Sequence, residues 1–278
     1  MRIDAHHHLW RYEPEAFAWI AEDGPIARDF SPTQLEAELG AARIDAAIAV
    51  QARQCEAETD FLLGCADACP AIVGVVGWID LRAPDIENRL GGRSDARVIG
   101  YRHVAQDEPD PDFLLGDAFV RGVRAVLAQD LAYDLLVSPA QLATAPRFLD
   151  RVGPGRLILD HAAKPAIRSG AWSPWAEAIA AAAAYPHLYC KVSGLVTEAD
   201  HAAWRPQDID RYLEHIFSLF SPERIIWGSD WPVCLLAAPY RRTLELVVDF
   251  VRRHHPGAEE QVFAANARRA YALPGSCA

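Results

Sequence analysis

Apolar residues gather in short runs along the chain, and most runs are followed by a longer segment of mixed apolar and polar residues. Runs such as IVGVVGWI and RLIL are apolar almost throughout and do not alternate with polar residues. This pattern is typical of parallel strands that are covered on both faces. We expect eight such strands, over Arg2–His6, Ile44–Gln51, Ile72–Ile79, Val98–His103, Ala132–Val137, Arg156–Leu159, Leu188–Val192 and Arg224–Trp227.

The segments between these runs carry signals for the start of a helix. Ser31-Pro32 precedes TQLEAELGAAR, Pro84 precedes DIENRL, and Ser173-Pro174 precedes WAEAIAAAAA. Proline is favoured in the first turn of a helix, and serine or aspartate just before it. Two further helices are expected after the last strand, over 239–255 and 258–270. Eight strand–helix alternations close most simply into one barrel. The sequence therefore predicts a single (β/α)₈ TIM barrel domain spanning residues 1–278.

The alternative to a barrel is an open, doubly wound sheet. Such a sheet usually carries a glycine-rich phosphate-binding loop after its first strand, and here that position reads AHHHLW. Neither GxGxxG nor a Walker A motif occurs in the chain. The longer connection over 106–113 is predicted to be a loop above the mouth of the barrel.

Charge and composition narrow the class of ligand. The formal net charge is −11 and no cluster of lysine and arginine stands out, which argues against nucleic acid and anionic membranes as partners. The chain has no apolar run of membrane-spanning length and no apolar leader at its start. The six cysteines lack paired spacing and are expected to be reduced, as in the cytoplasm. A small molecule is therefore the expected partner.

The first candidate site residues are two histidines at the end of the first strand. The active site of a (β/α)₈ barrel lies at the carboxyl ends of the strands. Residues two apart on a strand point the same way, so His6 and His8 can reach one ion or one substrate atom. His7 is expected to face the other side and to be structural.

Two further candidates come from late strands. His161 follows the apolar run RLILD, where packing gives no reason for a histidine, and Asp160 before it is expected to point away. Asp230 follows RIIWGS and is placed to bind a metal ion or to deprotonate water. A buried, hydrogen-bonded histidine and a helix N-cap are the structural alternatives. Three histidines are expected on the same rim of the barrel, and this favours a catalytic or metal-binding role for them over a structural one.

Other polar and aromatic residues at strand ends could contact a substrate. Arg102 and His103 end one strand, and an arginine there suits a carbonyl or anionic group, although a salt bridge between strands is the alternative. The only two lysines, Lys164 and Lys191, could bind substrate or pair with a buried carboxylate such as Asp134. Tryptophans at or near strand ends could stack on a sugar ring or simply pack. The expected substrate-binding residues are Trp10, Gln51, Arg102, His103, Lys164 and Trp231; Trp19 and Trp78 are also near strand ends.

Several blocks of the sequence resemble the amidohydrolase-related hydrolases. IDAHHHLW resembles the IDxHxHxW opening of that family. GYRHVAQDEPD, LDHAAKP, CKVSGLVTEAD, WGSDWPVCLLAAPY and NARRAYAL are similar to later blocks of its sugar-lactonase branch, which includes the L-fuconolactone and L-rhamnonolactone hydrolases of bacterial deoxysugar breakdown. The likeness extends over essentially the whole chain. His7 departs from the family, which often has glutamine there.

The resemblance implies a TIM barrel that hydrolyses an aldonolactone to the open acid. By the resemblance, His6 and His8 correspond to the first-strand pair, His161 to the later histidine and Asp230 to the last-strand aspartate. These four residues would hold one divalent ion, usually zinc, or the histidines alone would polarise the carbonyl. We hypothesise that Asp230 deprotonates the attacking water, with His161 among the catalytic residues. No residue matches the carboxylated lysine of the binuclear relatives securely.

Two alternative functions are left open by the sequence. The same scaffold could hydrolyse a carboxylated, aromatic-derived lactone or decarboxylate a substrate. A dianionic substrate needs several arginines at the mouth, and only Arg102 is clearly placed there. A barrel that binds a sugar or a metal without catalysis is the second alternative, although all four rim residues are present. The identity of the sugar and the oligomeric state, a homodimer included, are not determined by the sequence.

Overall fold

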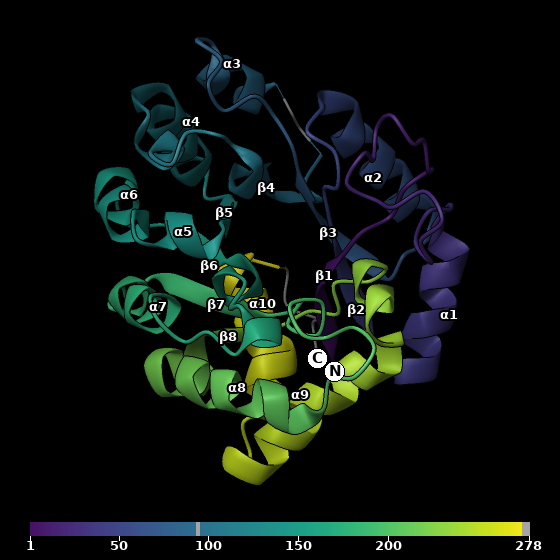
Figure 1. The fold of residues 1–278 in the computed structure, drawn as a ribbon. Helices are drawn as coiled ribbons and strands as arrows, with labels where there is room; N and C mark the ends of the chain where they lie inside the picture. Colours follow the sequence, from purple (N-terminus) through teal and green to yellow (C-terminus); the bar gives the residue numbers. More distant parts are fainter. Residues whose placement is uncertain (93–94, 274–278) are drawn as a thin grey trace.

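Eight parallel strands form a ring in the computed structural model of this protein, which describes residues 1–92 and 95–273. Their order around the ring follows the sequence, so the predicted (β/α)₈ barrel is confirmed (Figure 1). The strands are β1 (Ile3–His7), β2 (Ala46–Val50), β3 (Ile72–Gly77), β4 (Val98–Val104), β5 (Ala132–Leu136), β6 (Arg156–Leu159), β7 (Leu188–Val192) and β8 (Ile225–Trp227). Strands β6 and β7 have the predicted bounds, and the others differ from prediction by one or two residues at one or both ends.

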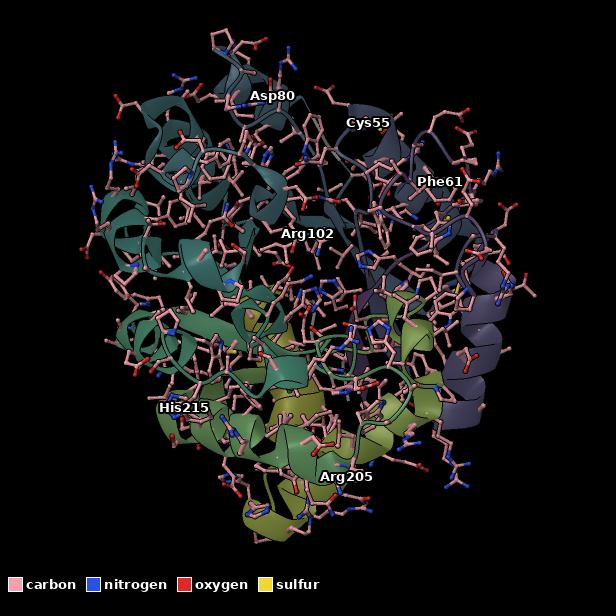
Figure 2. All side chains as sticks on the ribbon, viewed as in Figure 1. Cys55, Phe61, Asp80, Arg102, Arg205 and His215 are labelled. Atoms are coloured by element: carbon pink, nitrogen blue, oxygen red, sulfur yellow. The ribbon has the colours of Figure 1, made fainter. Side chains whose placement is uncertain are left out.

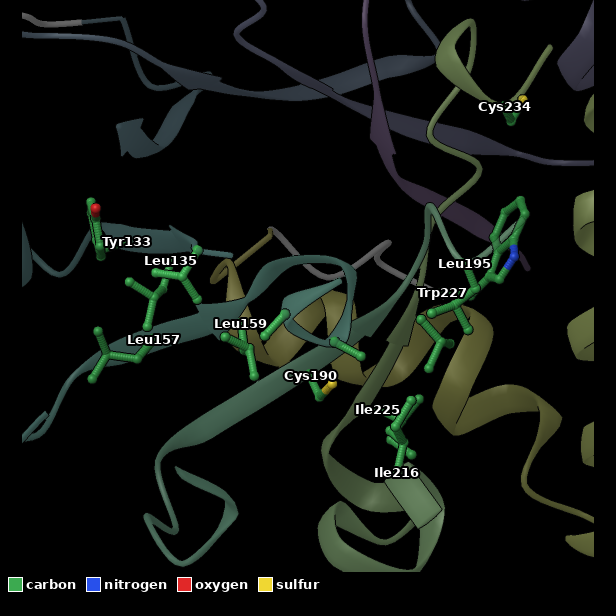
Figure 3. Packing of buried hydrophobic residues seen from close by; sticks show 14 of the residues in the cluster. Tyr133, Leu135, Leu157, Leu159, Cys190, Leu195, Ile216, Ile225, Trp227 and Cys234 are labelled. Atoms are coloured by element: carbon green, nitrogen blue, oxygen red, sulfur yellow. The ribbon is translucent and has the colours of Figure 1, made fainter. Parts of the chain in front are cut away.

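Helices surround the ring. They are α1 (Pro32–Ala42), α2 (Glu56–Ala68), α3 (Ile86–Gly91), α4 (Asp117–Ala128), α5 (Pro139–Leu142), α6 (Ala145–Val152), α7 (Trp175–Ala183), α8 (Pro206–Phe220), α9 (Tyr240–His254) and α10 (Asn266–Ala270). Strand residues that face outward pack against these helices, as Ile225 of β8 and Ile216 of α8 do in one continuous apolar layer (Figure 3). The apolar runs of the sequence are thus covered on both faces, as parallel strands require.

A second apolar cluster fills the inside of the barrel. Alternate strand residues such as Ile48, Val76 and Ile158 form it together with Tyr271 from the end of the chain. The C-terminal segment is tied to the first residues of the strands, because the Asn266 side chain donates a hydrogen bond to the carbonyl of Ile225 at 2.7 Å. The interior is therefore packed at that end, and the open mouth lies at the other.

Backbone hydrogen bonds between β1 and the segment after β8 close the ring. The amide of His8 donates to the carbonyl of Trp231 at 2.7 Å, and the amide of Asp230 donates to the carbonyl of His6 at 2.8 Å. Gly228 permits this approach, since a Cβ there would lie 2.5 Å from the Cβ of His6. We call this junction the seam. It joins the first and last candidate site residues directly.

An irregularity in β1 decides which histidines face the pocket. Asp4 is opposite Ala47 and His7 is opposite Ala49, so β1 contains one extra residue over this stretch. Such a bulge re-aims the side chains that follow it. His6 and His8 consequently point into the barrel, whereas His7 shares the outer face with Ala49. The expected orientations of the three histidines are confirmed, although the bulge was not foreseen.

The structure also describes five of the cysteines. Cys55, Cys65, Cys69, Cys190 and Cys234 are free thiols, and Cys277 lies outside the described residues. Among the residues that the structure describes, none of the helices combines the length and the apolar character needed to cross a membrane.

Candidate active site

A cavity of about 380 Å³ opens at the mouth of the barrel. Its walls are formed by His8, Ala16, Trp19, Ala52, Arg53, Gln54, Arg102, Val104, Gln106, Asp107, Leu136, His161, Lys164, Asp230 and Val233. Gln106 and Asp107 come from the connection after β4, as the predicted loop above the mouth requires. Figure 2 shows Arg102 near the centre of the ring of strands, whereas Asp80 and His215 lie towards the periphery.

His6, His8 and Asp230 meet at the seam. The Nε2 atoms of the two histidines are 3.3 Å apart, and they lie 3.8 Å (His6) and 3.4 Å (His8) from Asp230 Oδ1. His8 Nδ1 is 2.8 Å from the carbonyl oxygen of Val50, which can only accept a hydrogen bond. His8 Nδ1 therefore carries a proton, and in the neutral ring its Nε2 is an acceptor facing the pocket.

His161 reaches the same group through an unusual turn. Strand β6 ends at Leu159, and four consecutive residues from His161 to Lys164 have positive φ, between 48° and 54°. Each such residue costs about 1–2 kcal/mol relative to right-handed backbone. The turn is held by the Trp175 indole, which donates to the carbonyl of Ala162 at 2.9 Å. It directs the His161 ring to within 4.5 Å of the His6 ring, centroid to centroid.

Asp160, in contrast, does not point away from the site as expected. It continues the alternation of β6, in which Ile158 faces the barrel interior, and so its carboxylate lies inside the barrel. Asp160 Oδ2 accepts a hydrogen bond from Arg102 Nη1 at 3.1 Å, and Oδ1 lies 3.5 Å from His6 Nδ1. The prediction failed because His161, and not Asp160, departs from strand geometry.

The protonation states of the group follow from burial and neighbouring charges. Burial lowers the pKa of His161 to about 4, and it lowers the pKa of His6 well below its usual range, with Lys191 adding to the shift. Burial acts to raise the pKa of Asp230, but the electrostatic effect of the neighbouring histidines, His161 before His8, outweighs it and lowers that pKa. At neutral pH the site thus combines a carboxylate with uncharged His6 and His161.

Arg102 supplies a fixed cation beneath the pocket. Its side chain is 4 % exposed, and its Nη2 donates to the backbone carbonyl of Gln51. Nη1 lies 3.1 Å from Asp160 Oδ2 and 3.2 Å from His6 Nε2. The salt bridge foreseen as an alternative for Arg102 is present, and the guanidinium also borders the pocket. It can therefore face a substrate while Asp160 holds it in place.

His6, His161 and Asp230 form a candidate site for a divalent metal ion. One nitrogen from each histidine and one carboxylate oxygen all lie within 4.8 Å of one another. Two imidazoles and a carboxylate are a donor set that zinc accepts. His8 Nε2, 3.3 Å from His6 Nε2, could add a fourth ligand. The residues therefore fit the ion that the family resemblance implies.

Four of the expected substrate-binding residues do not line the pocket. Trp10 packs behind His8 against Phe17 and Phe30; Gln51 donates to the backbone of Arg102; His103 lies 2.7 Å from Glu108; and Trp231 packs on Phe30. All four are nearly or fully buried. Direct contact of these four side chains with a substrate therefore stays a prediction. Arg102 and Lys164 do line the pocket.

Several wall residues were not foreseen from the sequence. Arg53 and Gln54 follow β2, and Asp107 follows β4 by three residues. Trp19 was expected near a strand end but was not among the expected substrate-binding residues. It lies twelve residues beyond β1, is 53 % exposed and lines the pocket. Exposure of a large aromatic side chain is the signal for a binding surface, but the sequence does not reveal it.

The buried His7 leads to a prediction about how the free energy of unfolding depends on pH. It is fully buried and forms no hydrogen bond of normal geometry with any described residue. Burial lowers its pKa from 6.5 to about 3. As the pH falls below 6.5, His7 of the unfolded chain becomes protonated, whereas buried His7 of the folded protein does not. Protonation therefore favours the unfolded state, and the free energy of unfolding decreases as the pH falls from 6.5 towards 3. Between pH 6.5 and pH 5, the wild type should lose about 2 kcal/mol more than the His7→Gln variant.

Urea unfolding of both proteins at the two pH values measures this difference. His254→Gln, at the surface end of α9, is the control and should follow the wild type. An identical pH dependence for wild type and His7→Gln would contradict the assignment of a buried, neutral His7.

The sequence and the fold were compared with known proteins. A family model described as amidohydrolase matches residues 3–273. An L-fucono-1,5-lactonase of Burkholderia multivorans is 41 % identical over 99 % of this chain and 97 % of its own length. An L-fucono-1,5-lactonase of Burkholderia ambifaria is 35 % identical over 86 % of this chain and 83 % of its own. A crystal structure of an amidohydrolase from Burkholderia multivorans with bound zinc is 40 % identical, with a TM-score of 0.93 and coverage of 99 % and 100 %.

Proposed function

The chain belongs to the amidohydrolase family, and from that premise we propose that it hydrolyses a sugar 1,5-lactone, of the L-fuconolactone kind, to the open acid. The observation that carries this proposal is the meeting of Asp230 with His6, His8 and His161 at the base of the pocket. The two lactonases that are 41 % and 35 % identical support the choice of substrate.

The charges around the pocket favour a neutral substrate. Of the described residues that line it, each cationic one has a carboxylate partner: Arg53 with Glu58 at 2.8 Å, Arg102 with Asp160 at 3.1 Å and Lys164 with Glu198 at 3.3 Å. A substrate with two carboxylates would have to compete with these partners. A polyol lactone instead needs hydrogen-bond donors and acceptors, which these side chains offer. A carboxylated lactone and a decarboxylation are therefore not favoured.

We assign Asp230 the role of general base. Its lowered pKa keeps it ionised at neutral pH, and it borders the pocket where water can reach it. Water that loses a proton to Asp230 attacks the lactone carbonyl carbon, and negative charge develops on the carbonyl oxygen. Nearby N–H groups of the histidines and the Arg102 guanidinium stabilise this charge. When the ring C–O bond breaks, the proton on Asp230 passes to the departing ring oxygen.

A metal ion fits the same residues. We propose that His6, His161 and Asp230, with His8 beside them, would hold one zinc ion. A bound ion would polarise the lactone carbonyl. Ser193, whose Oγ is 2.9 Å from His161 Nδ1, would orient the His161 ring with its Nε2 towards the pocket.

A panel of substrates tests the proposed function. The protein is assayed after dialysis against a chelator and again with one equivalent of zinc, so that metal content does not decide the result. Acid release is expected from L-fucono-1,5-lactone in at least one of the two forms, and neither acid nor CO₂ from 2-pyrone-4,6-dicarboxylate. Absence of acid release from every sugar lactone in both forms would refute the proposal. Release of CO₂ would favour a decarboxylase.

Replacement of Trp19 is expected to weaken substrate binding. Its exposed indole stands at the pocket wall and packs edge-on against Trp10, with ring centroids 5.9 Å apart. An indole can stack on the C–H face of a sugar ring. Replacement by alanine should raise KM for the sugar lactone about tenfold, the equivalent of about 1.4 kcal/mol, and leave kcat within about twofold.

Steady-state kinetics of three variants check this prediction. Trp19→Phe keeps an aromatic surface and should restore most of the affinity. Trp172→Ala removes a partly exposed tryptophan just before α7, outside this pocket, and should leave KM unchanged. An unchanged KM in Trp19→Ala would show that the indole does not contact the substrate.

A further inference from the structure

A lysine lies buried beneath the site, and the proposed mechanism does not use it. Lys191 is on β7, fully buried, and its side chain points into the barrel. Its Nζ lies 2.5 Å from Asp134 Oδ2, 3.0 Å from Asp160 Oδ1 and 3.1 Å from His6 Nδ1. The ammonium group has three N–H donors and meets three groups that can accept. The pairing with Asp134 that the sequence suggested as an alternative is confirmed.

Asp134 is held in turn by Tyr271, the residue that follows α10. The hydroxyl of Tyr271 lies 2.8 Å and 2.7 Å from the two oxygens of the Asp134 carboxylate. The Tyr271 ring also lies beside the ammonium, with Nζ 5.3 Å from its centroid. The Lys191 ammonium is therefore held by the Asp134 carboxylate and the Tyr271 ring, and it also faces His6 Nδ1.

The contacts around His6 define the direction of its hydrogen bonds. A lysine ammonium can only donate, so His6 Nδ1 accepts from Lys191. A neutral imidazole that accepts at Nδ1 carries its proton on Nε2. The Nε2 proton has an acceptor, because His8 donates from Nδ1 to Val50 and offers its own Nε2 at 3.3 Å. Three hydrogen bonds then run in one direction, from Lys191 through His6 and His8 to the backbone.

The opposite tautomer of His6 fits less well. A proton on Nδ1 would face the Lys191 ammonium at 3.1 Å, and the carboxylate oxygen that could accept it, Asp160 Oδ1, is 3.5 Å away. His6 Nε2 could then accept from Arg102 Nη1 at 3.2 Å. That guanidinium nitrogen already has Asp160 Oδ2 as an acceptor at 3.1 Å, so it does not need the His6 lone pair.

We infer that Lys191 is a positioning residue that holds His6 in the tautomer with its proton on Nε2. His6 then donates from Nε2 to His8, whose ring lines the pocket, and this hydrogen bond fixes the His8 ring beside Asp230, the base of the proposed reaction. A metal ion can bind His6 Nε2 only after that proton has left. Lys191 therefore also weakens metal binding. The catalytic consequence rests on the proposed function, whereas the tautomer does not.

Two measurements that need no lactone test the inference. The tautomer is read from ¹H–¹⁵N spectra of histidine-labelled, metal-free protein, with His6 assigned by comparison with His6→Gln. The wild type should carry the His6 proton on Nε2, and Lys191→Met should move it to Nδ1. Zinc affinity is measured by competition with a chromophoric chelator, and Lys191→Met should bind zinc about tenfold more tightly than the wild type.

Two further variants keep the test decisive. Lys191→Met leaves Asp134 without its cation and could fail to fold, so Lys191→Met combined with Asp134→Asn provides the same measurement in a charge-matched background. Lys164→Met removes the only other lysine, 30 % exposed at the rim, and should leave the tautomer unchanged.

Three results would overturn the inference. The first is a wild-type His6 with its proton on Nδ1. The second is an unchanged tautomer in the folded Lys191 variants. The third is a gain in zinc affinity no larger than that of Lys164→Met, which would reduce the role of Lys191 to its charge. None of these results bears on lactone turnover by the wild type, which the substrate panel decides separately.

Discussion

Replacing Asp230 by asparagine is expected to lower kcat for lactone hydrolysis by about 10³-fold or more, because it removes the base that activates water. The amide keeps the size of the carboxylate, and the backbone of Asp230 still donates to His6 across the seam. The fold and the affinity for the lactone should therefore be retained. Single-turnover kinetics, together with thermal unfolding, measure both effects.

The control for this variant is another aspartate near a strand end. Asp80 follows β3 by three residues, but its side chain is 43 % exposed and lies 3.7 Å from Arg82. Asp80→Asn should hydrolyse the lactone at the wild-type rate. Normal turnover in Asp230→Asn would disprove the assignment of the base.

The second prediction concerns Gly194. Its replacement should lower activity by displacing a catalytic side chain, and not by removing the base. Its φ is +66°, and a Cβ at this position would lie 2.8 Å from His161 Nδ1 and 3.1 Å from Asp230 Oδ2. The methyl group of Gly194→Ala must therefore displace one of these two side chains. A displacement of about 1 Å in a catalytic group can cost about 10²-fold in rate. We expect a loss of kcat of that size.

Gly170 offers a matched control. It has φ of +68°, and a Cβ there would meet no atom within 4 Å. Both alanine variants should lose about 1–2 kcal/mol of stability from left-handed backbone, as measured by chemical unfolding. Only Gly194→Ala should lose activity. Equal activity in the two variants would show that the space around His161 and Asp230 is not limiting.

The barrel could be predicted from the sequence because each strand is covered on both faces. A continuous apolar run such as RLIL ends where the next polar residue begins, so the bounds of β6 could be predicted from it. The bulge in β1 could not be foreseen, since Ala5 and His6 show no local signal for it. The register of β1 against β2 depends on contacts with residues far away in the chain.

The candidate site could be predicted in part. His6, His8, His161 and Asp230 do lie together, because the strand ends of a barrel converge. A position at a strand end, however, does not reveal which face a side chain takes. For this reason the sequence did not reveal that the side chains of His103 and Trp231 pack against phenylalanines away from the pocket. Nor did it reveal that the Asp160 carboxylate points into the barrel.

Asp4 was missed although it lies within the IDAHH block. It is fully buried on the outer side of the seam, where it accepts hydrogen bonds from the Ser229 amide at 2.8 Å and the Tyr240 hydroxyl at 2.9 Å. The site residue His6 is only two positions away in sequence, whereas the partners of Asp4 are 225 and 236 positions away. Pairings of this kind become visible only when the chain is folded.

The seam also fixes the moment at which this protein can become active during its synthesis. His6 and His8 leave the ribosome more than 200 residues before their partner Asp230, which also brings the closing backbone hydrogen bonds. A nascent chain that stops before β8 thus has an open ring, with β1 lacking the neighbour that completes it. Tyr271, which supports Lys191 through Asp134, emerges later still. Catalytic competence is therefore acquired only after β8 and the segment up to Tyr271 have been made.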